Sequence, residues 1–291
     1  MIYEVRHVTE IRYSSIIRQA RFNLRLKPAV WPGQILTDYR LVIRPAPATI
    51  VEESGPFVVN NSRIVLKEPI SQLSIESDFV IDNSGIAKVG ANLGPTVDQV
   101  RSAALLLRDL SEYGPARYLF STRMVHPEPE IASWARAFIN GSQPVVAAGI
   151  ALMQAIYAEF RFDGKATRVD TPPIEAFRKK RGVCQDFAQI MIIAFRAHGI
   201  PAAYVSGYLR TNPPPGSRRL IGADASHAWV NLWCGQELGW VGFDPTNNVV
   251  AHHDHIFTAM GRDYADVAPI DGVFHGQSGQ QLKVSVDVSP L

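Results

Sequence analysis

RGVCQDFA, residues 181–188, is a glycine turn that leads into a helix, and the first turn of that helix carries a cysteine, Cys184. Apolar residues at helical spacing predict the helix as far as His198, and GIP at residues 199–201 ends it. Unpaired N–H groups at a helix N-terminus favour a thiolate, which is the nucleophilic form of cysteine. Most free cysteines, however, are simply small buried apolar residues. This stretch alone leaves both interpretations open.

Two later stretches favour a catalytic cysteine. ADASHAWVNLW, residues 223–233, has a strand pattern with His227 near its start, and LGWVGFDPT, residues 238–246, has a second strand pattern that runs to Asp244. The short turn between them predicts an antiparallel hairpin, which would bring Asp244 beside His227. A cysteine on a helix, a histidine base on a strand and an orienting acid on the next strand form a nucleophile–base–orienter arrangement.

These motifs resemble those of the transglutaminase-like superfamily, in particular a bacterial group described as transglutaminase-like proteins or candidate cysteine proteases. The resemblance covers nearly the whole chain and implies a catalytic triad of Cys184, His227 and Asp244. The chain departs from the group at Gln189, where members often carry histidine, and at residues 53–57, where an Asp…Gly-Asn pattern is usual. The matching stretches are GVCQDFA at 182–188, GADASHAW at 222–229, GWVGFDPTN at 239–247 and GRDYADV at 261–267.

The pattern of apolar residues changes along the chain. Alternation predicts strands over residues 1–90, with a hairpin signal at Asn60-Asn61-Ser62. Helical patterns follow a glycine-rich break, and the one at residues 145–160 is apolar enough to lie beneath the Cys184 helix. A closing strand is predicted at residues 282–288.

We therefore expect an α+β fold with two parts. Residues 1–90 are predicted to form an N-terminal antiparallel β-sandwich-like domain. The resemblance implies that residues 91–291 form a papain-like transglutaminase core, in which helices pack on an antiparallel sheet after a preceding helical segment.

The composition excludes several classes of protein. At 291 residues and 46% apolar content, the chain is long enough for a sizeable core. A net charge of +2 gives no argument for binding nucleic acid or a membrane. Two cysteines cannot form a disulfide framework, so a reducing compartment fits. The first residues do not read as a signal region, and no apolar run is long enough for a membrane span, so we expect a cytoplasmic protein.

Two further residues near the motifs are given structural roles. Cys234 falls on the opposite strand face from His227 and is predicted to be an ordinary packed residue. Asp186, in the first turn of the Cys184 helix, is expected to complement the helix dipole.

Two other segments are predicted to lie outside the regular structure. His252, His253 and His255 predict a flexible loop rather than a metal site. The proline-rich residues 211–219 predict an extended, exposed segment, which is either the rim of the cleft or an inert connector.

The resemblance implies acyl transfer from an amide. The Cys184 thiolate would attack the carbonyl carbon, and the N–H of Cys184 with a second donor would hold the oxyanion. His227 would protonate the leaving amine and then activate water or an acceptor amine, while Asp244 fixes the imidazole tautomer and stabilises its cation. No metal, nucleotide or other cofactor is needed.

The triad does not encode the acceptor. We expect hydrolysis of a peptide or isopeptide-type amide, because no amine-binding site is recognisable. The alternatives are a protein-glutamine gamma-glutamyltransferase, in which an amine accepts the acyl group, and a non-catalytic binding module that retains the fold. A peptide or protein amide is the expected partner, with no nucleic acid and no membrane, and the oligomeric state is left open.

Overall fold

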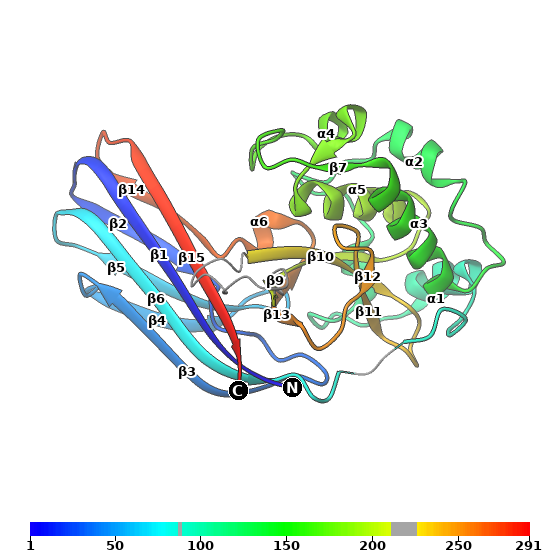
Figure 1. Cartoon of the computed structure of the whole chain (residues 1–291), viewed down its shortest axis with the longest axis horizontal. Coiled ribbons are helices and arrows are strands. Elements are labelled where there is room, and N and C mark those ends of the chain that lie inside the picture. The colour runs from blue at the N-terminus through cyan, green and yellow to red at the C-terminus, as the bar shows by residue number, and fades with distance from the viewer. Residues whose placement is uncertain (87–88, 211–225) are drawn as a thin grey trace, which may run out of the picture.

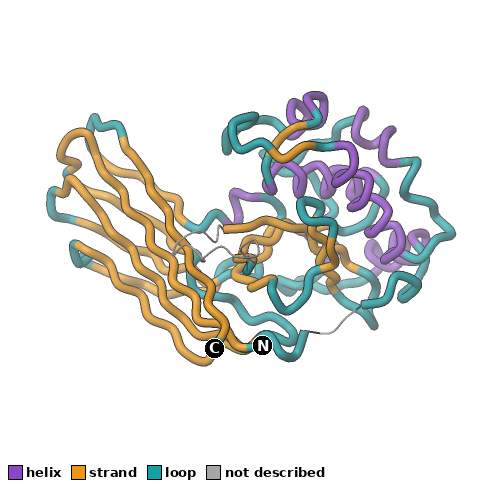
Figure 2. Tube along the Cα trace, in the orientation of Figure 1, coloured by secondary structure: helices purple, strands orange, loops and turns teal. Residues whose placement is uncertain are grey.

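A computed structural model describes residues 1–86, 89–210 and 226–291 of the chain. Long strands form one half of the molecule, and helices gathered around a smaller sheet form the other half (Figure 1). Figure 2 shows that nearly all of the helix lies in this second half. The predicted α+β class, a β-sandwich joined to a core of helices on an antiparallel sheet, is confirmed.

Two four-stranded antiparallel sheets make up the sandwich. Their inner faces enclose an apolar core that includes Ile11, Phe22, Ile64 and Leu73. The alternating sequence explains this arrangement, because successive side chains of a strand point to opposite faces of the sheet. In spatial order, one sheet consists of β15 (Gln280–Pro290), β1 (Ile2–Ile17), β6 (Ile70–Asp82) and β3 (Ile35–Arg44), and the other of β14 (Ile270–His275), β2 (Gln19–Leu24), β5 (Asn60–Leu66) and β4 (Thr49–Ser54).

The hairpin between β4 and β5 turns at residues 55–59, so the turn expected at Asn60-Asn61-Ser62 is wrong. The Gly55 N–H donates to the Val59 carbonyl at 2.9 Å, and β5 already begins at Asn60. The polar run continues the strand because its side chains find partners there: Asn60 donates to the Pro28 carbonyl at 3.0 Å.

The end of the chain returns to the sandwich. β15 pairs with β1, and β14 pairs with β2. The predicted closing strand is therefore present, but it joins the N-terminal sheets, although the expected division assigned residues 91–291 to the core. The division at residue 90 stays a prediction. The two termini lie side by side (Figure 1), where the Leu291 N–H donates to the Ile2 carbonyl at 3.0 Å.

The core is a five-stranded antiparallel sheet covered by helices. Helix α5 (Cys184–Ala197) packs on the neighbouring strands β9 (Ala202–Leu209) and β10 (Ser226–Trp233). Helix α3 (Val145–Glu159) packs on α5 and on β11 (Trp240–Asp244), as its apolar surface predicts. In spatial order the strands are β12 (Val249–Val250), β11 (Trp240–Asp244), β10 (Ser226–Trp233), β9 (Ala202–Leu209) and β13 (His255–Gly261). The other elements are α1 (Val97–Leu106), the 3-10 helix η1 (Pro115–Tyr118), α2 (Pro129–Ala135), α4 (Pro173–Lys179), α6 (Tyr264–Val267) and the short parallel pair β7 (Arg161–Phe162) and β8 (Arg181–Gly182). Within the described ranges, no helix has the length and apolar character needed to cross a membrane.

An apolar junction joins the sandwich to the core. Tyr3 and Phe79 of the sandwich pack with Tyr208 and Ile256 of the core sheet. His7 of β1 is 1% exposed there, and its Nδ1 lies 2.8 Å from the Tyr208 hydroxyl. Burial lowers the pKa of His7 to about 4, so this imidazole is neutral at pH 7.

A buried asparagine also ties the sandwich to the core. Asn83 follows β6 directly, and its side-chain N–H group donates to the carbonyls of His253 and His255 at 2.9 and 3.2 Å. These bonds hold the start of β13 against the end of a sandwich strand.

Candidate active site

Cys184 is the first residue of α5 and is partly exposed. The turn before it is held by Asp186, whose Oδ2 accepts the Val183 N–H at 2.8 Å and the Thr167 hydroxyl at 2.6 Å. Burial raises the pKa of Asp186 against the lowering effect of these two bonds. Asp186 therefore anchors the turn that presents the cysteine, which is a more specific role than complementing the helix dipole.

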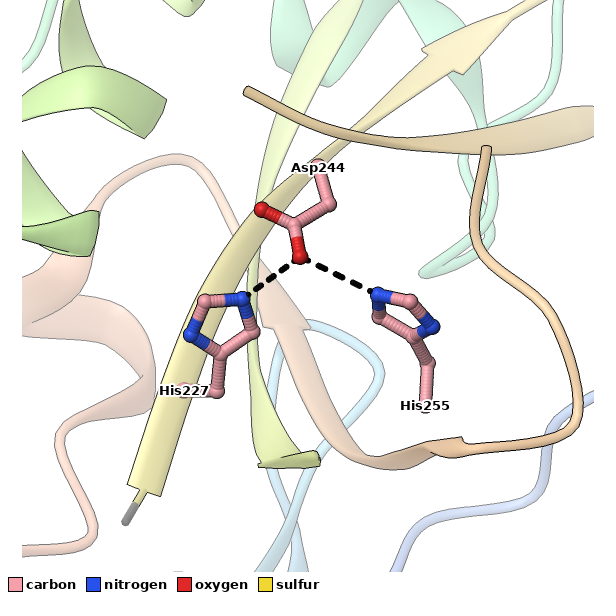
Figure 3. A group of neighbouring side chains, drawn as sticks. All are labelled: His227, Asp244 and His255. Atoms are coloured by element: carbon pink, nitrogen blue, oxygen red, sulfur yellow. Dashed lines mark hydrogen bonds and ion pairs between the residues drawn. The ribbon is translucent and has the colours of Figure 1, made fainter. Parts of the chain in front are cut away.

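The predicted hairpin brings His227 and Asp244 together. β10 and β11 pair antiparallel, with Val230 opposite Phe243. His227 lies near the start of β10 and Asp244 at the end of β11. Nε2 of His227 lies 2.8 Å from Oδ2 of Asp244 (Figure 3). The two side chains are 9% and 0% exposed, so water competes little for this bond.

The Asp244 carboxylate is saturated with hydrogen-bond donors. Oδ1 accepts the backbone N–H groups of Thr246 and Asn247 at 2.9 and 3.2 Å, and Oδ2 accepts the Asn247 side chain at 2.7 Å. Burial alone would raise the pKa of Asp244, but hydrogen bonds from His227 and His255 and the charge of His227 hold it well below its usual range. The carboxylate is therefore ionised at neutral pH and fixed in orientation.

His227 interacts with Cys184 as well as with Asp244. Nε2 is used by Asp244, and Figure 3 shows Nδ1 pointing away from that carboxylate. Burial alone would lower the pKa of His227, but hydrogen bonds to Asp244 and Cys184, and the charges of both, raise it to about 10. At neutral pH the imidazole is therefore a cation, which stabilises a neighbouring thiolate. The three residues named from the sequence are thus gathered at one place.

A second imidazole on Asp244 was not anticipated. Nε2 of His255 lies 3.2 Å from Oδ2 of Asp244 (Figure 3). His255 opens β13 and is 2% exposed, so the expected flexible loop is wrong at this position. The contact is hard to foresee because β10 and β9 separate β11 from β13 in the sheet. The available signal was the apolar run after His255, which marks the start of a buried strand.

Two groups of side chains in the described chain offer several metal-ligand atoms at short range. In the group of His227, Asp244 and His255, hydrogen bonds of 2.8 and 3.2 Å explain why the three side chains lie close together. In the group of His252, His253 and Asp254, the Asp254 carboxylate accepts a hydrogen bond from the Tyr3 hydroxyl and lies 3.9 Å from Arg210, so it already has protein partners. The groups are His227, Asp244 and His255, and His252, His253 and Asp254.

Cys234 has a setting unlike that of Cys184. It is fully buried in the core, and its thiol donates weakly to the Leu232 carbonyl at 3.5 Å. Burial raises the pKa of the Cys234 thiol. Its predicted position as an ordinary packed residue is confirmed.

Gln189 lies in α5, one helical turn after Gln185, and is fully buried. Neither its amide nitrogen nor its amide oxygen has a hydrogen-bond partner among the described residues. A buried amide without partners costs free energy, so Gln189 weakens the helix locally.

A cavity of about 730 Å³ lies beside helix α5. One wall includes Val169, whose carbonyl accepts the side chain of Gln185, the residue after Cys184, at 2.9 Å. Another includes Tyr264, which packs edge-on against Tyr204 at a centroid distance of 6.1 Å. Tyr204 is buried near enough to Cys184 to sense its charge. The cavity therefore lies near the start of α5, although Cys184, His227 and Asp244 do not line it themselves. The proline-rich segment at residues 211–219 lies outside the described residues.

Comparisons with known proteins agree with the motifs and the fold. The model of the transglutaminase-like superfamily matches residues 132–245, which contain Cys184, His227 and Asp244. The model of the bacterial transglutaminase-like N-terminal region matches residues 3–82.

Similar proteins include both whole-length and partial relatives. An uncharacterized protein of Mycobacterium tuberculosis is 36% identical over 301 aligned residues, which cover 99% of this chain and 93% of that protein. A protein-glutamine gamma-glutamyltransferase of Pseudomonas aeruginosa is 32% identical over 123 residues, 40% of this chain and 18% of that protein. The crystal structure of a candidate cysteine protease from Cytophaga hutchinsonii superposes with a TM-score of 0.75 at 20% identity, covering 99% of this chain and 90% of that one. This last likeness concerns the fold.

Proposed function

Since the chain belongs to the transglutaminase-like superfamily, we propose that it is a cysteine-dependent enzyme that transfers the acyl group of a peptide or isopeptide-type amide through a Cys184 thioester. The observation that supports this most is the bond of 2.8 Å between His227 and Asp244, on a histidine that also interacts with Cys184. These are the relations that a nucleophile, a base and an orienting acid require.

In the proposed first half-reaction, the Cys184 sulfur attacks the amide carbonyl and a carbon–sulfur bond forms. The carbonyl oxygen becomes an oxyanion beside the first N–H groups of α5, which have no acceptor within the helix. The carbon–nitrogen bond then breaks as Nδ1 of His227 gives its proton to the leaving amine. The thioester and a neutral imidazole remain.

In the second half-reaction, water gives a proton to Nδ1 of His227 and adds to the thioester carbonyl. The carbon–sulfur bond breaks, a carboxylic acid leaves, and the thiolate and the imidazolium are restored. Asp244 keeps Nε2 protonated throughout and balances the positive charge on the ring. An amine in place of water would give the transferase reaction with the same residues.

Hydrolysis is our first choice of the two outcomes. In the described part of the chain we find no feature that would select an amine over water. The local similarity to a gamma-glutamyltransferase is the specific observation that keeps amine transfer as the second candidate. A non-catalytic binding module is a weaker alternative, because the sequence carries all three residues that the proposed mechanism needs.

The cavity beside α5 is the proposed site for the substrate side chain next to the reacting carbonyl. Its lining combines apolar and aromatic groups, such as Val169, Ile193 and Tyr264, with charged groups of both signs, such as Arg123 and Asp170, so it suits a long side chain with a polar end. Ala265 lines it and is exposed, so Ala265→Trp should narrow it with little cost to the fold. The variant should lose turnover of large side chains and keep turnover of small ones, whereas an unchanged preference would contradict the assignment.

The decisive experiment is a panel of peptide and isopeptide substrates, assayed with and without a primary amine. Cys184→Ala should abolish turnover while the melting temperature stays near that of the unmodified protein. Cys234→Ala is the matched control and should retain turnover. Turnover that survives in Cys184→Ala would overturn the mechanism. Amine incorporation that outpaces hydrolysis at modest amine concentration would replace the first outcome by the second.

The cytoplasmic location, and the absence of nucleic-acid and membrane partners, remain proposals from the composition. Fractionation of the native cells would test the location directly.

A further inference from the structure

We propose that His255 is a positioning residue for this reaction, a second histidine that holds Asp244 in the orientation from which it serves His227. The proposal rests on the proposed function. Figure 3 shows the Asp244 carboxylate between the two imidazoles, with both bonds made to the same oxygen. The distances from Oδ2 are 2.8 Å to His227 and 3.2 Å to His255.

The tautomer of His255 follows from its other nitrogen. The backbone N–H of His252 donates to Nδ1 of His255 at 3.3 Å. A nitrogen that accepts a hydrogen bond carries no proton, so the neutral ring bears its proton on Nε2. His255 therefore donates to Asp244 and does not compete with it for a proton. Asp244 is left as an acceptor for both rings.

The surroundings of His255 keep the ring in place. Its side chain is 1% exposed, and the ring packs edge-on against Trp229 at a centroid distance of 5.3 Å. Its backbone carbonyl accepts the side chain of Asn83 at 3.2 Å. A fixed donor on a fixed strand can restrain a carboxylate that sits at the end of a different strand.

Asp244 needs this restraint on the side away from the hairpin. Among the described residues, the side-chain donor to Oδ2 besides the two histidines is Asn247, which is exposed and lies in the turn after β11. Without His255, Oδ1 would still accept the backbone N–H groups of Thr246 and Asn247, but Oδ2 would be left between His227 and this exposed amide and could shift towards either. The charged and titratable groups that face His255 are Asp244, His227 and His252.

Two substitutions of similar length separate hydrogen bonding from packing. His255→Gln keeps an N–H donor near the position of Nε2, and His255→Met fills about the same space without one. We expect His255→Met to lower turnover about tenfold, less than the ~10²–10⁴-fold that general acid–base catalysis contributes, with little change in KM. His255→Gln should recover most of that loss.

The pH dependence of Cys184 alkylation gives a readout that packing alone would not move. When Asp244 is no longer held, the His227 cation is less stabilised and so is the thiolate beside it. In His255→Met, the pH at which the alkylation rate rises should therefore be about one unit higher, which corresponds to a tenfold change in thiolate stability. In His255→Gln, the alkylation rate should depend on pH as it does in the unmodified protein. Equal losses in the Gln and Met variants, or no effect in the Met variant, would overturn the proposal.

A measurement on the unmodified protein covers the case in which a variant fails to fold. Nitrogen-15 NMR of the histidine rings at neutral pH should show His255 protonated on Nε2 and unprotonated on Nδ1. The reverse tautomer would refute the donor role. If the unmodified protein turns over no amide, the proposed function fails, while the alkylation profiles and the tautomer still decide the role of His255.

Discussion

Gly149 of α3 lies against the ring of Phe243, the residue immediately before Asp244 on β11. A Cβ atom at position 149 would lie 2.5 Å from ring carbons of Phe243, which is closer than real Cβ contacts come. Helix and strand therefore approach as closely as they do because position 149 has no side chain. This approach sets where the end of β11, and with it Asp244, meets His227.

Gly149→Ala should have two opposite effects on the stability of the fold. Alanine is the better helix former by about 1 kcal/mol, so propensity alone predicts a more stable protein. Overpacking a close contact costs about 1–3 kcal/mol, so we expect the melting temperature to fall. Gly164→Ala is the control, because a Cβ there would meet nothing within 4 Å. A Gly149→Ala protein that melts at or above the unmodified protein would contradict the packing argument.

The two cysteines should differ in reactivity. Cys184 is partly exposed beside a cationic imidazole, whereas Cys234 is fully buried with the pKa of its thiol raised. Iodoacetamide should therefore label Cys184 in the folded protein and leave Cys234 intact, as read by mass spectrometry of the peptides. Denaturation should make both available. Equal labelling in the folded state would argue against Cys184 as the nucleophile.

Turnover should be lost at alkaline pH, where His227 loses its proton. The release of the amine needs the proton on Nδ1, and the pKa of His227 is raised to about 10, so turnover should fall as the pH rises through about 10. Alkylation of Cys184 needs only the thiolate and should not fall there. The raised pKa also stabilises the fold fully below about 6.5, and this stabilisation is lost as the pH rises through about 10. A loss of turnover already near pH 6.5 would mean that His227 is not held as a cation.

His7 should make the fold acid-sensitive. Its pKa is about 4 in the folded protein and 6.5 in the reference state, so the unfolded chain binds the proton first as the pH falls. Stability is then lost from pH 6.5 down to about 4, by about 3 kcal/mol at 1.36 kcal/mol per pKa unit. Denaturant unfolding at pH 7 and pH 4 should show a smaller loss in His7→Gln than in the unmodified protein. Identical losses in the two proteins would show that another group causes the loss of stability at low pH.

Gln189→Met should stabilise the protein. The amide of Gln189 is buried, and no described residue bonds to it, whereas methionine fills a similar volume without polar atoms. An unsatisfied buried polar group costs about 1–3 kcal/mol, so the melting temperature should rise. Turnover reports whether the amide also has a role in the cleft. A lower melting temperature in the variant would show that the amide has a partner after all.

The sequence was sufficient for the relations that depend on neighbouring elements. Cys184 at a helix start follows from glycine and helical spacing, and the contact of His227 with Asp244 follows from a hairpin with a short turn. In both cases the geometry is local, so strand parity and turn length determine it. The roles of these residues in catalysis stay predictions until an activity is measured.

The relations that the sequence did not reveal depend on distant pairing. His255 reaches Asp244 across two intervening strands, and no spacing rule predicts a side-chain contact between β13 and β11. The return of β14 and β15 to the sandwich is a strand pairing between opposite ends of the chain. The polar run Asn60-Asn61-Ser62 looked like a turn because its partners, such as the Pro28 carbonyl, come from segments that local patterns do not place nearby.

The pairing of β15 with β1 reverses the order in which the two halves of the molecule are completed during synthesis. The ribosome makes β1 first, but the outer edge of β1 is covered only when residues 280–290 emerge. Until then the nascent sandwich has an open edge of unpaired backbone groups, the kind of edge that recruits strands from other chains. The core has all its strands by Gly261 and can fold first. The sandwich, which begins before the core in the sequence, is therefore completed after it, and a truncation that removes β15 would leave the edge of β1 unpaired.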